Sequence, residues 1–177
     1  MNALDQQLLD AARAGDTDSV RTAIEGGARV DVRDEELRTP LLLAVHGDHE
    51  SPWLATGVTG SVPMLHALLP AGPDLKLRNR FGGIALIPAS ERGHVAYVRE
   101  LLRVTDIDVD HVNRLGWTAL LEAVILGDGG RAHRQIVELL LAAGATPGLP
   151  DGDGGTALEH AERRGFAEIA ALLRDTR

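Results

Sequence analysis

The sequence predicts an all-α solenoid of about five helix-turn-helix units joined by hairpin fingers. A six-residue block recurs at spacings of 45, 34 and 38 residues, and an Asp or Asn precedes each block by five residues. The same three spacings therefore appear in two independent features, as expected of a repeat architecture. The blocks are Thr39–Ala44, Ile84–Ala89, Thr118–Ala123 and Thr156–Ala161, and the preceding residues are Asp34, Asn79, Asn113 and Asp151.

Each block predicts the start of a short helix, because a hydroxyl cap opens three of the four and Pro40 follows the first cap. A glycine such as Gly93 then marks a helix end. Apolar residues at helical spacing follow, as in Val98, Leu101 and Leu102, and predict a second helix. The repeating unit is therefore a pair of helices and an extended turn.

The third unit departs from this pattern at two positions. Ile84 replaces the hydroxyl cap, and Pro88 follows about one turn later, where proline lacks the backbone N–H of a helix interior. Such departures are typical of functional or strained places. Alternatively, Gly82 and Gly83 let the helix begin later, so that Pro88 lies in its first turn without strain.

A unit of about 33 residues with these motifs resembles the ankyrin repeat. The resemblance identifies the chain as a small bacterial member and implies a single ankyrin-repeat domain over residues 1–177, an all-α ankyrin-repeat solenoid. It also implies that the Asp or Asn before each block ties neighbouring hairpins together through backbone hydrogen bonds. The motif histidine is replaced by Leu42, Ile87, Leu121 and Glu159. The implied repeats are 4–34, 35–79, 80–113, 114–151 and 152–177.

Two insertions and two terminal units interrupt the period. The insertions lie near residues 47–60 and 129–133, and they indicate either loop growth or a binding face. The first unit carries polar residues, including Asp5, which predicts an N-terminal cap. The last unit predicts a C-terminal cap with charged residues on its outer face, namely Arg163, Arg164, Glu168 and Asp175.

Composition limits the class of partner. Aromatic residues are 3% of the chain and the net charge is −8, which disfavours binding to nucleic acids and to anionic membranes. The sequence has no cysteine, and no apolar stretch approaches the ~18 residues of a membrane span. We therefore expect a cytoplasmic monomer that holds no metal or cofactor and binds another protein.

Aligning the units predicts a recognition surface on the concave face. The fingers contribute aromatic and arginine side chains, which dominate interface hot spots. Trp117 has an alternative role, which is to pack on the neighbouring finger and stiffen the stack. The predicted finger residues are Arg80, Phe81, Arg114, Leu115 and Trp117, and the predicted helix residues are Glu91, Glu122 and His160.

These features favour a module that binds a partner protein through its concave face, in an adaptor, inhibitor or immunity-type role. The alternative is an enzyme or small-molecule binder that uses Glu91, Glu122, His111 and His160 for acid–base chemistry. In an open groove Glu122 is expected to titrate as an ordinary solvated carboxylate.

Overall fold

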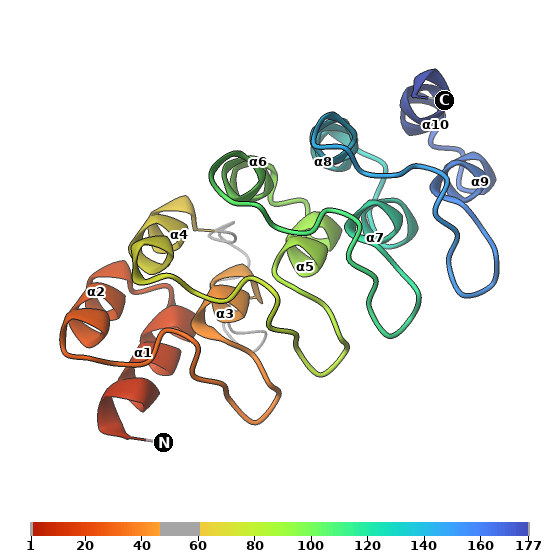
Figure 1. Ribbon diagram of the computed structural model, residues 1–177. Coiled ribbons are helices and arrows are strands. Elements are labelled where there is room, and N and C mark those ends of the chain that lie inside the picture. The colour runs from red at the N-terminus through yellow and green to blue at the C-terminus, as the bar shows by residue number, and fades with distance from the viewer. Residues whose placement is uncertain (1, 47–60, 177) are drawn as a thin grey trace. The chain divides into compact units, whose positions relative to one another are not determined.

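The chain is all-helical in the computed structural model, which describes residues 2–46 and 61–176. Ten α-helices form five pairs in these two ranges, and the ranges contain no strand (Figure 1). The predicted fold class is therefore confirmed. No helix in the described ranges is long and apolar enough to cross a bilayer. The predicted insertion at 47–60 lies outside them.

The described residues divide into two compact units, Met1–Arg80 and Phe81–Arg177. In the first unit α1 packs against α2 and α3, and α4 packs against both α2 and α3. Its elements are α1 Ala3–Ala14, α2 Thr17–Glu25, α3 Pro40–His46, α4 Val62–Leu68 and the short 3₁₀ helix η2 Leu69–Ala71.

The second unit forms two layers of helices. The first helix of each pair packs on its equivalents, in the order α5, α7 and α9, and α8 packs between α6 and α10 (Figure 1). The layers are joined within pairs, because α5 contacts α6, α7 contacts α8 and α9 contacts α10. The elements are α5 Leu86–Glu91, α6 Val95–Val104, α7 Ala119–Ile125, α8 Arg131–Ala142, α9 Ala157–Arg163 and α10 Ala167–Asp175.

Hydroxyl caps begin the first helices as predicted. Thr118 accepts the backbone N–H of Leu121 and begins α7. Thr156 begins α9, where its backbone N–H donates to the Glu159 carboxylate and completes a capping box. Glu159 stands where the repeat motif has histidine. The glutamate therefore supplies its own hydrogen bond with Thr156 at the start of the helix.

Pro88 lies in the first turn of its helix. Helix α5 begins at Leu86, whereas α7 begins one residue earlier in its own block, at Ala119. Pro88 is thus the third residue of α5 and does not interrupt an established helix. The structure therefore supports the alternative in which the helix begins late.

Three of the four Asp and Asn side chains before the blocks close their own fingers. Asn113 Oδ1 accepts the backbone N–H groups of Leu115 and Trp117, at 2.9 and 3.0 Å. Asp34 and Asp151 make the equivalent pair of bonds two and four residues ahead. A backbone hydrogen bond links neighbouring fingers, because the Arg114 N–H donates to the Phe81 carbonyl at 3.0 Å.

The third residue after each of these side chains adopts a left-handed conformation. It is glycine in three fingers, with φ values of 79° at Gly82, 79° at Gly116 and 87° at Gly154. A Cβ on Gly116 would lie 2.8 Å from the Gly152 nitrogen of the next finger. The exception is Leu37, with φ 61° and a side chain that is 41% exposed.

Asp5 is a buried ion-pair partner in the first unit. Its carboxylate accepts the Arg29 backbone N–H at 2.9 Å and both Nε and Nη2 of the Arg29 guanidinium, at 3.0 and 2.7 Å. These bonds hold the pKa of Asp5 below its ordinary value. Within the predicted polar N-terminal cap, Asp5 is therefore a buried residue.

Arg164 also differs from its predicted place on an outer face. Its Nη1 donates to the carbonyls of Val124, Ile125 and Gly127, at 2.9, 2.5 and 2.8 Å. These carbonyls lie at the C-terminal end of α7 and just beyond it, where helices leave acceptors without partners. A side chain of the last pair therefore caps a helix of the preceding pair.

The insertion at 129–133 lengthens α8 at its start. It supplies Gly130 as the N-cap and the first turn of α8. In that turn His133 lies with Nδ1 2.7 Å from the Asp128 carboxylate, and its Nε2–H donates to the Glu91 carbonyl at 2.8 Å. The insertion thus joins consecutive repeats.

Candidate functional site

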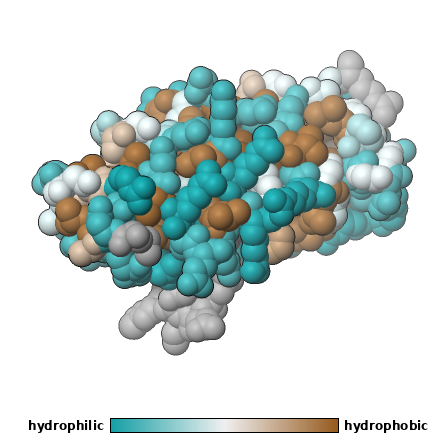
Figure 2. Space-filling view, turned by 60° about the horizontal axis from the view of Figure 1, so that its bottom comes forward, coloured by the Kyte–Doolittle hydropathy of each residue, from teal (hydrophilic) through white to brown (hydrophobic). Residues whose placement is uncertain are grey.

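Two apolar side chains project from neighbouring fingers of the second unit. Phe81 is 54% exposed and Leu115 is 55% exposed. Each follows an asparagine by two residues, so they occupy equivalent positions. Figure 2 shows brown apolar residues separated by teal polar side chains on the face turned towards the viewer.

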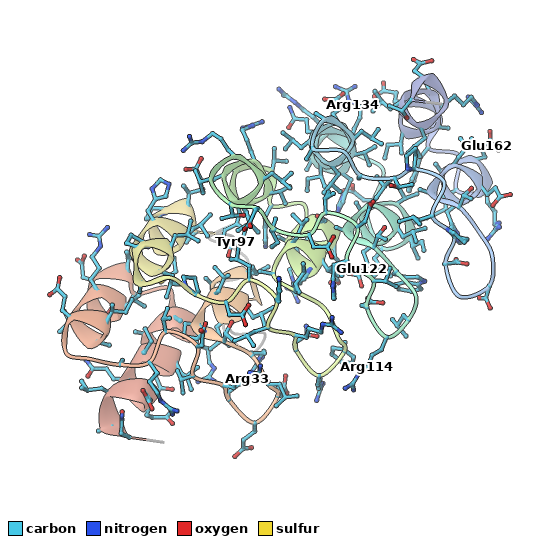
Figure 3. All side chains as sticks on the ribbon, viewed as in Figure 1. Arg33, Tyr97, Arg114, Glu122, Arg134 and Glu162 are labelled. Atoms are coloured by element: carbon cyan, nitrogen blue, oxygen red, sulfur yellow. The ribbon has the colours of Figure 1, made fainter. Side chains whose placement is uncertain are left out.

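Arg114 and Trp117 lie on the same finger as Leu115. Arg114 is exposed, and its aliphatic stem covers Gly82, since a Cβ there would lie 2.9 Å from Arg114 Cγ. Figure 3 shows Arg114 on this finger of the chain, away from the helices. Trp117 is half-buried, and its backbone N–H contributes to finger closure.

Arg80 belongs to the first unit. Its backbone N–H donates to the Glu36 carbonyl at 3.1 Å, and its guanidinium Nη1 lies 3.5 Å from a Glu36 carboxylate oxygen. The predicted finger residues are therefore divided between the two units, with Phe81, Arg114, Leu115 and Trp117 in the second.

Glu122 lies between α5 and α7 and is only 6% exposed (Figure 3). The Asn113 Nδ2 donates to Glu122 Oε1 at 2.7 Å. Burial and then the nearby Glu91 charge raise the pKa of Glu122 to about 7, although the Asn113 bond opposes this rise. The expectation of an ordinary solvated carboxylate was wrong, because the helix face that carries Glu122 is packed against α5.

The predicted histidines have other partners. His160 Nε2 lies 2.6 Å from Asp151 Oδ2, and this hydrogen bond lowers the pKa of Asp151. His111 Nε2–H donates to the Gly82 carbonyl at 2.8 Å. Glu91 and Glu122 are therefore close enough for their charges to interact, but the hydrogen bonds do not bring either histidine to them.

A nine-residue spacing identifies partners that the sequence analysis missed. Asn113 precedes Glu122 by nine residues, and Asp151 precedes His160 by nine residues. In both fingers the residue that closes the finger also bonds the side chain on the following helix. The constant spacing could have revealed both pairs.

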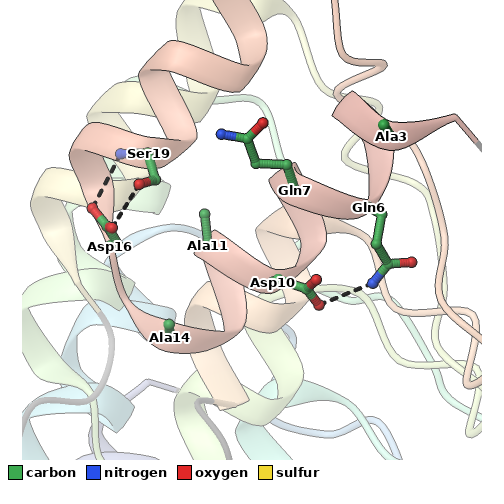
Figure 4. Close-up of a pocket in the computed structure, with 8 residues that line it drawn as sticks. All are labelled: Ala3, Gln6, Gln7, Asp10, Ala11, Ala14, Asp16 and Ser19. Atoms are coloured by element: carbon green, nitrogen blue, oxygen red, sulfur yellow. Dashed lines mark hydrogen bonds between the residues drawn. The ribbon is translucent and has the colours of Figure 1, made fainter.

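A shallow hollow also lies beside α1 and the start of α2 (Figure 4). Its polar side chains bond one another. Gln6 donates to Asp10 at 2.9 Å, and Asp16 accepts from the backbone N–H and hydroxyl of Ser19. These bonds explain helix capping and surface pairing without a ligand. Within residues 2–46 and 61–176, no three acidic or histidine side chains are placed to hold a metal ion.

Comparison with known proteins gives one consistent result. Residues 53–151 match the family model for ankyrin repeats, in three copies. The ankyrin repeat protein YahD of Escherichia coli (strain K12) is 41% identical over 93% of this chain and 92% of its own length. An ankyrin-repeat protein of Treponema pallidum (strain Nichols) is 30% identical over 78% of this chain and 45% of its own length.

A solved structure has the same fold. The crystal structure of an ankyrin repeat domain from Acinetobacter baumannii AYE superposes with a TM-score of 0.84 at 43% sequence identity. The match covers 99% of this chain and 87% of that chain.

Proposed function

Because the chain belongs to the ankyrin-repeat family, whose repeats generally mediate protein–protein interaction, we propose that it is a non-enzymatic module that binds a partner protein. The proposed contact surface comprises Phe81, Arg114, Leu115 and Trp117 of the second unit, with Glu91 and Glu122 on the adjacent helices. In this proposal Arg80 and His160 are peripheral to the contact.

The exposure of Phe81 and Leu115 carries this proposal. The Asn113 side chain and a backbone bond between neighbouring fingers already hold the finger in shape. These hydrogen bonds do not require the Phe81 and Leu115 side chains to be exposed to water. Large apolar side chains at the ends of rigid segments are typical anchors of protein interfaces.

Alanine substitutions test the contact surface. The immobilised chain is used to capture a partner from extracts of its host, and the Kd of the purified pair is measured by calorimetry. Phe81→Ala and Leu115→Ala should each weaken binding by at least ~2 kcal/mol, as hot-spot truncations do. The melting temperature should change little.

Leu126→Ala is the matched control, because Leu126 is 49% exposed but lies at the end of α7. It should leave the Kd unchanged. An equal loss of affinity in Leu126→Ala, or unfolding of Phe81→Ala and Leu115→Ala, would count against the proposed surface. Trp117→Ala is less selective, since Trp117 is half-buried.

The enzyme alternative has one observation in its favour, the raised pKa of Glu122 beside Glu91. General acid–base catalysis also needs a second group within reach of a substrate. His160 is held by Asp151, and His111 donates to a backbone carbonyl. The geometry therefore supports the binding module better.

A further inference from the structure

Three exposed cationic side chains of the first unit have no ion pair within residues 2–46 and 61–176. They are Arg33, Lys76 and Arg78. Other arginines of this unit have acidic partners, at 2.7, 2.8 and 3.5 Å in the pairs Arg29 with Asp5, Arg38 with Asp34 and Arg80 with Glu36. The three unpaired charges can therefore meet a group from another molecule.

The unpaired charges lie on two segments, 31–36 and 74–80, which run side by side (Figure 1). A hydrogen bond joins the segments at each end. The first residue of 74–80 donates its N–H to the side chain of the first residue of 31–36, at 2.9 Å. The last residue of 74–80 donates its N–H to the carbonyl of the last residue of 31–36, at 3.1 Å. Between these bonds lie Arg33 on one segment and Lys76 and Arg78 on the other.

Carboxylates on the same segments already have other partners. Asp31 accepts the Asp74 N–H at 2.9 Å, and Asp74 in turn accepts the Lys76 N–H at 2.9 Å. Asp34 closes its finger and pairs with Arg38. These bonds also fix the backbone that carries the unpaired cations, so a ligand would bind to a surface that is already ordered.

The repeat fold does not require a charge at either arginine position. Arg33 and Arg78 each directly precede the Asp or Asn before a block, and the equivalent residues of the second unit are Val112 and Pro150. The fingers that follow Val112 and Pro150 close with the same pair of hydrogen bonds as the first finger. Uncharged residues therefore serve these positions equally well, and the two arginines are available for binding.

We propose that Arg33, Lys76 and Arg78 bind an acidic linear segment of the partner protein. This inference rests on the proposed function and names the chemistry of a contact on the first unit. The guanidinium group of arginine matches a carboxylate with two parallel hydrogen bonds. Neighbouring helices pack about 8–10 Å apart, and an extended chain covers this distance in about three residues. Two carboxylates spaced in this way can reach both arginines.

The net charge of the chain, −8, favours a short acidic segment over a long polyanion. Charges more than about 8 Å apart are largely screened at physiological salt, so a short segment meets mainly the local cations. A nucleic acid or an anionic membrane extends over the acidic remainder of the surface and is repelled there.

A random linear-peptide library displayed on phage tests the proposal. The library is first depleted on the full-length triple variant Arg33→Gln, Lys76→Gln and Arg78→Gln, and is then selected on the natural chain. Enriched peptides should contain at least two Asp or Glu residues within about four positions. The affinity of a synthetic copy of the best peptide is then measured by fluorescence anisotropy.

The triple variant should bind this peptide about tenfold more weakly than the natural chain, because three exposed ion pairs of modest strength are lost together. The control variant combines Arg99→Gln, Arg131→Gln and Arg163→Gln, which removes the same charge from exposed residues of the second unit. It should change the affinity less than about twofold. All the substituted side chains are exposed, so both variants should melt close to the natural chain.

Glu35 provides a change in the opposite direction. It is exposed, lies two residues after Arg33, and has no ion pair within the described part of the chain. Its charge repels an acidic ligand, so Glu35→Gln should strengthen peptide binding about twofold. Raising the salt from about 50 to about 200 mM should weaken binding to the natural chain and affect the triple variant less. An equal dependence on salt in both proteins would contradict the site.

The outcomes separate this site from the proposed function. Enriched peptides without acidic residues, a selection that yields no binder, or an equal loss of affinity in the control variant would overturn the acidic-segment site and leave the binding module standing. A short double-stranded DNA, or vesicles that contain phosphatidylserine, would also overturn it by binding more tightly than the peptide and losing that binding in the triple variant. The binding module is decided separately by the partner capture and by Phe81→Ala and Leu115→Ala in the second unit.

Discussion

The Glu122 carboxyl binds its proton more tightly in the folded chain than in the unfolded chain. Its pKa rises from 4.5 to about 7 on folding. Between these values the unfolded chain has released the proton and the folded chain retains it. The contribution of Glu122 to the free energy of unfolding therefore falls as pH rises through this interval, by about 3 kcal/mol in total.

Glu122→Gln should remove this dependence. Glutamine retains an oxygen that accepts the Asn113 amide bond and has no charge to bury. The variant should equal the natural chain near pH 4.5 and exceed its free energy of unfolding by up to about 3 kcal/mol near pH 8. Urea denaturation across this range measures the difference. A difference that does not change with pH would contradict the raised pKa.

Leu37 is the second residue that lowers the free energy of unfolding. Its left-handed backbone is strained for a side chain with a Cβ, and the equivalent residue is glycine in three other fingers. Leu37→Gly should raise the free energy of unfolding by about 0.5–1 kcal/mol, after the entropy cost of glycine. Leu37→Ala is the control and should give no such gain, because alanine retains the Cβ.

At the level of the finger, Gly116 meets two requirements. It adopts a left-handed backbone, and the next finger lies so close that a side chain would not fit. Gly116→Ala introduces a Cβ against the Gly152 nitrogen, whereas a Cβ added at Gly144, with φ 93°, would meet no atom of another segment within 4 Å. Gly144→Ala should cost only the backbone strain, about 1–2 kcal/mol. Gly116→Ala should cost clearly more, by thermal or urea denaturation. Equal losses would show that the fingers separate easily.

The sequence predicted these elements well where local signals determine them. Thr118 and Thr156 open helices as expected, and the recurring Asp or Asn residues mark the fingers. The late start of α5 remained open, because a missing cap and an early proline fit two helix registers equally. Only the backbone bonds of the folded unit distinguish them.

Contacts between repeats were the part that sequence patterns could not supply. Arg164 reads as an ordinary charged residue of a terminal cap, yet it reaches carbonyls almost forty residues earlier in the chain. Glu122 reads as a groove carboxylate, and its burial depends on how closely α5 packs against α7. Such long-range placement depends on packing geometry and not on local spacing.

Arg164→Ala therefore tests how the last two repeats are coupled. It removes three hydrogen bonds to the end of α7 and should lower the free energy of unfolding by about 1–3 kcal/mol. The neighbouring Arg163→Ala, an exposed change on the same helix, should cost much less. Hydrogen exchange at the C-terminal turn of α7 should accelerate in Arg164→Ala alone. Unchanged exchange there would contradict the capping role.

The hydrogen bond between a finger residue and the helix residue nine positions later requires the two side chains to be complementary. One finger holds an amide opposite a carboxylate, Asn113 with Glu122, and the next holds a carboxylate opposite an imidazole, Asp151 with His160. A repeat can then be exchanged as a module only when both residues of its pair are exchanged together. Glu122→His alone should destabilise the chain, and adding Asn113→Asp should restore part of the loss, as a double-mutant cycle by urea denaturation would measure. Strict additivity would mean that the two positions diversify independently.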